Sequence, residues 1–170
     1  MKSPTTLLVD EGHGVGNDLD VRRVVTGHDA HGKAVVMFDD LCPRTAFGVQ
    51  AWSTDRPVAD NNDDYDGARR RMDIVSSGGS VVRVMRIPAG THSYMHRTQS
   101  LDYGILLEGR LDLHLDDGVI VELKAGDVVI QRGTIHAWVN PYEAPCTIAF
   151  ILLPAAPVLA NGQPLAPTHR

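Results

Sequence analysis

The chain has 170 residues, of which 43% are hydrophobic and 22% are charged, and its net charge is −5. This length favours a single domain with a substantial core. The acidic balance argues against a nucleic-acid partner, because binding to phosphates requires a basic face. No apolar run reaches the roughly 20 residues that a membrane span needs, and no segment resembles a signal peptide. We therefore expect a cytoplasmic protein that acts on a small molecule and contacts neither nucleic acid nor membrane.

The first half of the chain divides into an arm, a group of strands and a polar connection. Residues 1–18 contain three glycines and no apolar periodicity, which predicts a flexible N-terminal arm. The runs VRRVVT and KAVVMF flank a turn at residues 28–32 that contains glycine, which predicts a hairpin. The run TAFGVQAWST, residues 45–54, is a third candidate strand. Residues 55–80 are a long polar connection with a short helical turn expected around 68–74, either a binding loop or a plain surface excursion.

The second half of the chain is a succession of short strands. From Val81 onward, apolar and β-branched runs are separated by turn residues at intervals of about 8–12 residues, which is typical of a sandwich or barrel. Helical periodicity is absent from this region. After Pro154 the chain becomes rich in proline and alanine, which predicts a tail over residues 155–170. We predict one all-β domain over residues 19–154, with its barrel core at about 81–153.

Two half-motifs in the barrel region carry a family resemblance. The first is Gly90-x5-His96-x-Thr98-x3-Asp102-x6-Gly109, and the second is Gly126-Asp127 followed by Gly133-x2-His136-x3-Asn140. Together they resemble the cupin superfamily, whose fold is a double-stranded β-helix, or jelly-roll barrel. The resemblance implies that fold here, with extra N-terminal strands. It departs from the family pattern where Thr98 replaces a histidine, Asp102 replaces a glutamate and Gln131 replaces a proline.

The resemblance also implies a metal site built from His96, Asp102 and His136. Two imidazoles and a carboxylate can hold a divalent ion and leave positions open for substrate; Fe, Mn, Ni and Zn all remain open as the metal. Alternation along strands allows His96 and His136 to approach from neighbouring strands. His92 would add a third imidazole if its loop folds inward, and otherwise it is an exposed loop histidine. The alternative for both motif histidines is a satisfied core position.

Further residues are candidates for proton transfer or for lining the pocket. Tyr103, next to Asp102, could donate a proton beside the catalytic groups His96, Asp102 and His136, although tyrosines more often serve packing. Arg97 and Arg132 should face away from the site, because neighbouring residues in a strand point to opposite sides. The expected pocket lining is Thr98, Trp138, Tyr94, Gln131 and Met85.

Several functions suit this apparatus. The first is a metal-dependent enzyme that decarboxylates, dehydrates or isomerises a small molecule bearing a carbonyl, enol or carboxylate group. The nearest alternative is an Fe-dependent dioxygenase. A metal-free, epimerase-like enzyme and a non-catalytic small-ligand-binding domain also remain open. We expect a homodimer in each case, because the N-terminal strands would expose an edge unless a partner covered it.

Overall fold

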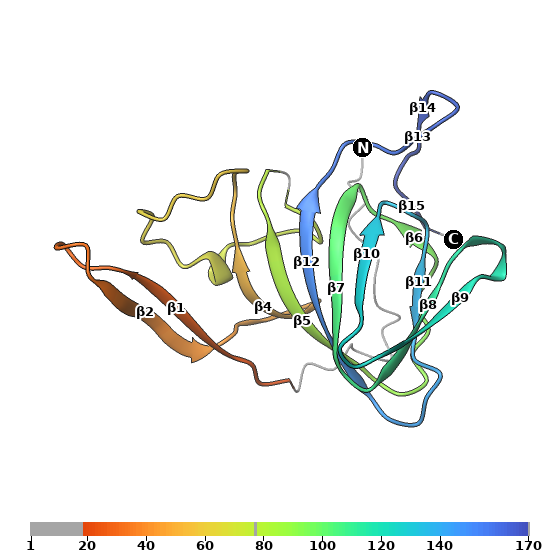
Figure 1. Ribbon diagram of the computed structural model, residues 1–170, viewed down its shortest axis with the longest axis horizontal. Helices are drawn as coiled ribbons and strands as arrows, with labels where there is room; N and C mark the ends of the chain where they lie inside the picture. The colour runs from red at the N-terminus through yellow and green to blue at the C-terminus, as the bar shows by residue number, and fades with distance from the viewer. Residues whose placement is uncertain (1–18, 77, 170) are drawn as a thin grey trace.

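The computed structural model describes residues 19–76 and 78–169, so the predicted flexible arm lies outside the described part of the chain. The predicted all-β jelly-roll is confirmed: nearly all regular structure is strand, and every strand pair is antiparallel (Figure 1). Six strands form the main sheet in the order β10-β7-β12-β5-β4-β3, and β11-β8-β9 form a second sheet. No helix of the described residues is long and apolar enough to cross a membrane.

The two sheets enclose the hydrophobic core. Their strands are β3 (Arg44–Thr45), β4 (Gly48–Ser53), β5 (Val81–Ile87), β7 (Ser100–Glu108), β8 (Arg110–His114), β9 (Ile120–Lys124), β10 (Val128–Arg132), β11 (Ala137–Val139) and β12 (Cys146–Pro154). Along β7, burial alternates with a period of two, so Ser100, Asp102, Gly104 and Leu106 are buried while the residues between them are more exposed. The same alternation places Ile148, Phe150 and Leu152 of β12 in the core.

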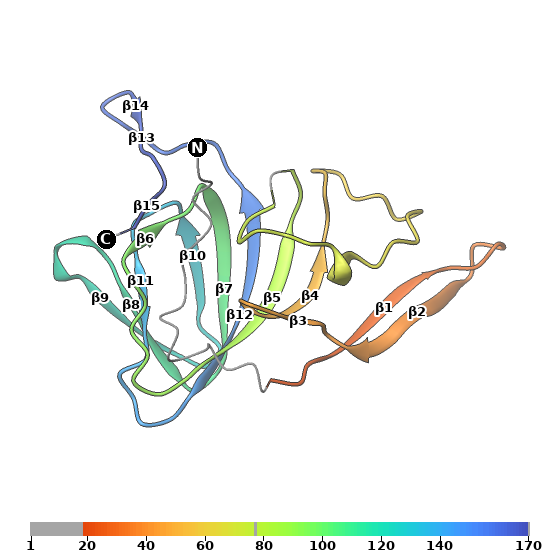
Figure 2. The same ribbon diagram turned by 180° about the vertical axis from the view of Figure 1, so that it is seen from behind.

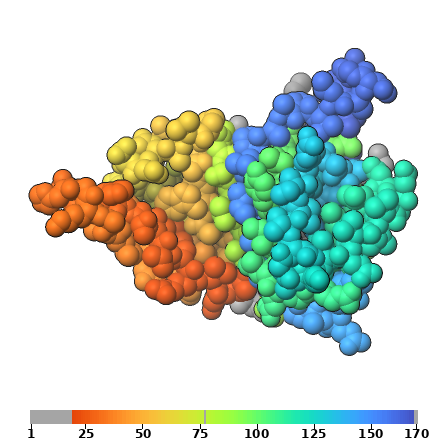
Figure 3. Space-filling view, in the orientation of Figure 1, coloured from red at the N-terminus to blue at the C-terminus, as the bar shows by residue number. Residues whose placement is uncertain are grey.

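The N-terminal hairpin forms as predicted. It pairs β1 (Arg22–His28) with β2 (Ala34–Leu41) around the predicted turn, with one register shift between Val25 and Thr26. The hairpin projects from one side of the barrel, as the ribbon and the space-filling view show (Figures 1 and 3). The third candidate strand divides into β3 and β4, which extend the main sheet beside β5.

The polar connection is partly pinned to the barrel. Its helical turn is a single 3-10 helix, η1 (Gly67–Arg69), shorter than the predicted turn because Arg70 already has an extended backbone. Side chains from β4 and β5 donate to backbone carbonyls of the connection: Gln50 to Ala68 and Arg70, and Arg83 to Asp73. Residues 74 and 75 pack against the core cluster, where the segment crosses β5 (Figure 2). Part of the connection therefore covers the inner face of the sheet.

The C-terminal segment does not leave the barrel as a simple tail. It forms the small hairpin β13 (Leu159–Ala160) and β14 (Gln163–Pro164), and ends in β15 (Thr168–His169). β15 pairs with β6 (His96–Arg97), with Thr168 opposite Arg97. A second 3-10 helix, η2 (Asp116–Gly118), joins β8 to β9. The composition of this segment, rich in proline and alanine, predicted a tail. Backbone pairing instead brings its end back to the strand that carries His96.

Candidate functional site

His96 and His136 face one another at one end of the barrel. Each backbone N–H donates to the other residue's carbonyl, at 2.8 and 2.9 Å, which forms an isolated antiparallel bridge. Residues directly opposite in such a bridge share a face, and the two imidazole centroids lie 4.3 Å apart at an interplanar angle of 47°. The structure therefore brings together the two histidines that come from the separate half-motifs.

Backbone carbonyls set the orientation of both imidazoles. The Nδ1 atom of His96 lies 2.9 Å from the carbonyl oxygen of Tyr94. A carbonyl can only accept a hydrogen bond, so this Nδ1 carries the proton and Nε2 bears the lone pair. The Nδ1 atom of His136 lies 3.0 Å from the carbonyl oxygen of Thr134, which favours the same tautomer. Nδ1–H bonds of this kind are typical of histidines that use Nε2 for a metal or a proton.

Gln131 holds the His136 side of the site in place. The Nε2 atom of this buried amide donates to the Thr134 carbonyl at 2.8 Å, the same carbonyl that faces Nδ1 of His136. Nε2 also lies 2.9 Å from Nδ1 of His136, which is a packing contact and not a hydrogen bond when Nδ1 carries its proton. Its carbonyl oxygen accepts from the backbone N–H of Gly133 at 3.4 Å. Burial, with a smaller contribution from the neighbouring His96, lowers the pKa of His136 to about 4. His136 is therefore neutral near pH 7, the form that can accept a proton or bind a metal.

Asp102 is the buried carboxyl of this region. It lies on β7 directly opposite Gln131 of β10, so the two side chains share a face. Burial raises the pKa of Asp102 to about 6, while the neighbouring Ser100 and Thr98 hydroxyls act in the opposite direction. Its Oδ1 atom is buried and has no hydrogen-bond partner among the described residues. Such an unmet acceptor is costly, which is why it points to a proton, a ligand or an ion as its partner.

An aromatic wall adjoins the two imidazoles. Trp138 is buried and packs edge-on against His136, with ring centroids 5.6 Å apart. Its other side meets Phe150 of β12 at 5.4 Å, also edge-on. Met85 lies opposite Ile148 and packs against the core cluster. The reactive groups therefore lie at the boundary between a polar cluster and the apolar core, the arrangement expected for a small organic ligand.

Three predicted site residues lie elsewhere. Tyr103 pairs with Ile130 and Ile151 on the outer face, because it follows the inward Asp102 on the same strand. Tyr94 has an exposed side chain and contributes its carbonyl oxygen instead.

The proposed third imidazole, His92, does not join the pair. It bridges Val139, and its ring packs edge-on against His114 at 5.8 Å. Val139 neighbours the inward Trp138 and so faces the other side of β11, which places His92 outside the cluster. Its loop is pinned by the hydroxyl of Ser93, which accepts from the backbone N–H of Trp138.

The donor set fits a metal in part. Two imidazoles with carbonyl-bound Nδ1 atoms and a carboxylate with an unmet oxygen are suitable donors for a divalent ion. However, within residues 19–76 and 78–169, no three His, Cys, Asp or Glu side chains are grouped closely enough to hold one. His96 and His136 are thus the assembled part of the ligand set, and Asp102 is its nearby carboxylate.

Sequence reasoning missed Ser100 and Thr134. Ser100 is buried two residues before Asp102, and its hydroxyl donates to Oγ1 of Thr98 at 2.8 Å. Its position on the inner face follows from the alternation that also placed Asp102, so the signal was available. The role of Thr134 depends on its backbone carbonyl, for which the amino-acid type gives no signal.

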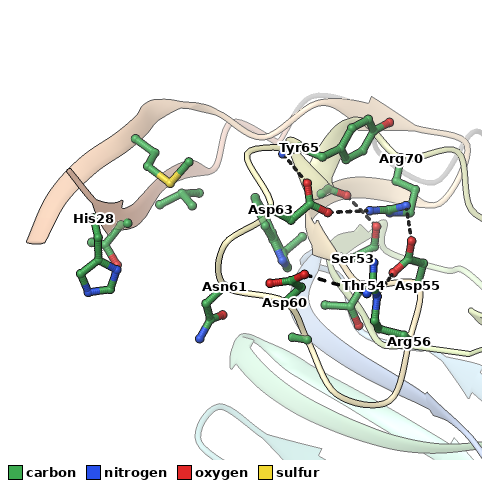
Figure 4. A pocket seen from close by; sticks show the side chains of 17 residues that line it. His28, Ser53, Thr54, Asp55, Arg56, Asp60, Asn61, Asp63, Tyr65 and Arg70 are labelled. Atoms are coloured by element: carbon green, nitrogen blue, oxygen red, sulfur yellow. Dashed lines mark hydrogen bonds and ion pairs between the residues drawn. The ribbon is translucent and has the colours of Figure 1, made fainter. Parts of the chain in front are cut away.

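A separate surface pocket lies between the N-terminal hairpin and the polar connection (Figure 4). Its charged groups already neutralise one another, since Arg70 contacts Asp55 at 2.9 Å and Arg56 contacts the same carboxylate at 3.3 Å. Arg70 also lies over the ring of Tyr65 at 4.6 Å. The same two arginines also lie near the acidic run at residues 60–66, Arg56 at 3.9 Å from Asp60 and Arg70 at 4.0 Å from Asp63. This pocket contains none of the predicted site residues.

Comparisons with known proteins agree with the fold and place the chain in a family. The family model for a cupin domain matches residues 83–152. Phomopsin biosynthesis cluster protein D of Diaporthe leptostromiformis is 36% identical over 155 residues, which cover 83% of this chain and 82% of that protein. The cupin-domain-containing oxidoreductase fogC of Aspergillus ruber is 34% identical over 166 residues, covering 90% of this chain and 82% of the relative. This chain belongs to the cupin superfamily.

A third relative is also named as a cupin-domain-containing protein and matches a similar share of the chain. The cupin-domain-containing oxidoreductase srdB of Neurospora crassa is 33% identical over 156 residues, which cover 86% of this chain and 80% of that protein. The similarity to these proteins extends beyond the barrel core into the flanking strands, since each match covers more than four fifths of the chain.

Proposed function

We propose that this chain is a cupin-type enzyme that acts on an oxygenated small organic molecule, with His96, His136 and Asp102 as its reactive groups. The observation that carries the proposal is the meeting of two imidazoles, 4.3 Å apart, beside Gln131, whose partner across the strands is a buried carboxyl, Asp102. The Oδ1 atom of that carboxyl has no partner among the described residues. A structural role alone would leave that acceptor unsatisfied at a cost in stability. A substrate proton or a metal ion would satisfy it.

The side chains supply proton transfer at near-neutral pH. Asp102 changes its protonation state at about pH 6, close to the pH at which a group is most effective as an acid or base. His136 stays neutral, and the Thr134 carbonyl orients its ring, so its Nε2 lone pair is available to a substrate hydroxyl or to a metal ion. Trp138 excludes water from one side. These roles suit isomerisation, dehydration or decarboxylation next to a carbonyl group.

A divalent metal is the cofactor that this donor set would hold. His96 and His136 would bind it through Nε2, and Fe, Mn, Ni and Zn all accept such ligands. Within the described residues Asp102 is not grouped closely enough with them to be the third ligand. When bound, the ion would polarise a substrate oxygen as a Lewis acid. The incomplete grouping of ligands keeps metal-free proton transfer by the same three residues as part of the proposal.

Oxidation is the second candidate function. Two of the relatives described above carry the name cupin-domain-containing oxidoreductase. That naming favours a redox reaction over a lyase or isomerase reaction, and a two-histidine, one-carboxylate site holding Fe(II) is the ligand set of oxygen-activating enzymes. On this alternative His96 and His136 would hold the iron, and Trp138 would border the substrate.

The test combines metal analysis with two assays on a panel of phenols, β-diketones and hydroxy acids. Oxygen uptake would identify oxidation, and deuterium exchange from solvent into the substrate would identify proton transfer. We expect turnover in one assay, and its loss in His96→Ala and His136→Ala but not in the control His114→Ala, whose ring contacts His92 outside the cluster. Ligand binding without turnover in either assay, with or without added metal, would show that the domain is a binding module.

We also propose a homodimer built on the N-terminal hairpin. A two-stranded hairpin is marginally stable by itself, and this one exposes large apolar side chains on Val24, Val36 and Leu41. A second copy of the chain would cover them. Light scattering should give twice the chain mass for the native protein, a monomer for Val36→Lys and a dimer for the control Ala30→Lys in the hairpin's turn. A monomeric native protein would contradict this proposal.

A further inference from the structure

A second cleft adjoins the strands that carry the reactive groups. Its volume is about 610 Å³, and it is bounded by residues 97–101, residues 132–134 and the C-terminal segment from Ala155 to Pro167. This volume is within the range of about 300–1,000 Å³ that is typical of small-molecule sites. The C-terminal segment forms one complete wall, so the cleft exists only because this segment returns to the barrel.

The wall is held in place at several points. Backbone hydrogen bonds join Ala155 to Gln99 at 3.3 Å and Leu165 to Val158 at 2.8 Å. Between these residues the β13–β14 hairpin turns through Asn161 and Gly162, which both have positive φ, at 51° and 74°. That pair of angles is the conformation that an Asn-Gly hairpin turn requires. The end of the segment pairs with β6. A chain rich in proline is thereby fixed into a defined surface.

Gly133 allows the wall to approach closely. A Cβ atom at this position would lie 3.0 Å from Cγ2 of Val158, closer than ordinary van der Waals contact. Gly133 also has a φ of +63°, which side chains disfavour. The position therefore serves two purposes, because it turns the chain after β10 and leaves room for the C-terminal segment.

Two arginines lie in this cleft without an acidic partner. Their sequence neighbours His96 and Gln131 face the barrel interior, so Arg97 and Arg132 face outward and line the cleft. Among residues 19–76 and 78–169, no aspartate or glutamate lines the cleft and neither arginine forms an ion pair. The Nε atom of Arg97 is buried and has no hydrogen-bond partner among the same residues. Two guanidinium groups and an unmet donor are suited to an oxyanion.

We propose that this cleft binds an organic carboxylate with an apolar body. Arg97 and Arg132 would bind the carboxylate, and the hydroxyls of Thr98, Ser100 and Thr134 border the same space. Leu101, Val158 and Leu165 provide apolar surface for the rest of the molecule. A carboxylate suits the cleft better than a more highly charged phosphate, because much of its lining is aliphatic and cannot solvate additional charge.

The proposal goes beyond the proposed function and does not depend on it. The cleft adjoins the reactive cluster at the Ser100–Thr98 hydroxyl pair, because both residues line the cleft and both act on the pKa of Asp102. A carboxylate ligand could thus be a substrate that extends toward Asp102 or an effector that binds beside it. Both have the same requirement, which is binding through the two arginines.

Calorimetric titration of the full chain with hexanoate, and with hexanamide as its neutral counterpart, tests the proposal. We expect hexanoate to bind more tightly than hexanamide, and Arg97→Gln or Arg132→Gln to weaken hexanoate binding by about tenfold or more, the usual effect of losing a hydrogen bond to a charged group. Arg71→Gln is the matched control, because Arg71 is exposed and lies outside the cleft. Thermal unfolding of each variant shows whether it is folded.

The length of the ligand tests the apolar wall. From butyrate to hexanoate, affinity should rise about fourfold per added methylene group, and less in Val158→Ala. His96→Ala should bind hexanoate as the native chain does, so loss of turnover and loss of carboxylate binding are separate results. The proposal would be overturned by equal affinity for hexanoate and hexanamide, or by no measurable binding of hexanoate. It would also be overturned if Arg132→Gln bound hexanoate as tightly as the native chain; Arg132 is exposed, so this substitution should not affect folding.

Discussion

Buried polar side chains occupy both ends of the inner barrel face, but they are used differently. At the β4–β5 end, Gln50 donates to the carbonyls of Ala68 and Arg70, and the Ser53 hydroxyl donates to that of Gly67 at 2.6 Å. At the other end, Asp102 has an oxygen without a partner among the described residues. Polar groups that fix a loop have their hydrogen bonds satisfied, whereas a reactive site retains polar groups that lack a hydrogen-bond partner. Substitutions at the two ends should therefore have opposite effects on stability and on activity.

The largest expected difference between the two ends is in turnover. His136→Ala removes a positioned acid–base or metal-binding group, so turnover should fall by roughly 10²–10⁴-fold. The measurement is the initial rate with whichever panel compound the native enzyme converts. Gln50→Ala, assayed at a temperature where it is folded, should keep turnover near the native value. Comparable losses in the two variants would mean that the two ends do not differ in function.

The pH dependence of stability provides a second comparison. Burial depresses the pKa of His136 from 6.5 to about 4, so its contribution to the unfolding free energy is complete above pH 6.5 and is lost as pH falls toward 4. The metal-free His136→Gln variant lacks this contribution. The stability advantage of the native chain over this variant should thus be smaller at pH 4 than at pH 7, by about 3 kcal/mol.

Urea unfolding of both proteins in the presence of a chelator measures this difference. His114→Gln is the matched control, because His114 lies outside the cluster and contacts His92. An advantage that is independent of pH between 4 and 7 would contradict the assignment of His136 as a neutral, buried imidazole.

Stability alone should change at the β4–β5 end. Gln50→Ala leaves backbone carbonyls of the polar connection without a donor, which should lower the unfolding free energy by about 1–3 kcal/mol. Chemical denaturation measures this loss, and proteolysis within residues 66–75 should become faster because the segment is released. Native stability in this variant would show that the amide does not pin the connection.

The strands and the meeting of His96 with His136 could be predicted because both follow local rules. Glycine turns and alternation define the strands, and the cupin-like spacing indicates which histidines converge. Alternation also required Tyr103 to face away once Asp102 faced inward, so that error could have been avoided. The sequence left open whether His92 joins the site, because the position of its loop depends on a hydroxyl contact at Ser93 that no sequence pattern specifies; the structure has the exposed loop histidine.

The return of the C-terminal segment could not be predicted from local patterns. β13, β14 and β15 each have two residues, and the segment between them contains prolines, which weaken a strand prediction. Pairing with β6 and the space above Gly133 determine its position, and both are tertiary features. The cleft that it forms could not be predicted from the sequence for the same reason. Alternation did predict that Arg97 and Arg132 face away from the histidines.

The unfolding free energy of Asp102→Asn at pH 8, without metal, tests the central claim most directly. Burial raises the pKa of Asp102 from 3.8 to about 6, so the native chain loses stability as pH rises through this interval, and above it holds a buried charge. The neutral amide avoids this cost. The variant should match the native chain near pH 4 and be more stable at pH 8 by up to about 3 kcal/mol. A variant that is less stable than the native chain at pH 8 would show that Asp102 is a structural group whose charge the fold requires.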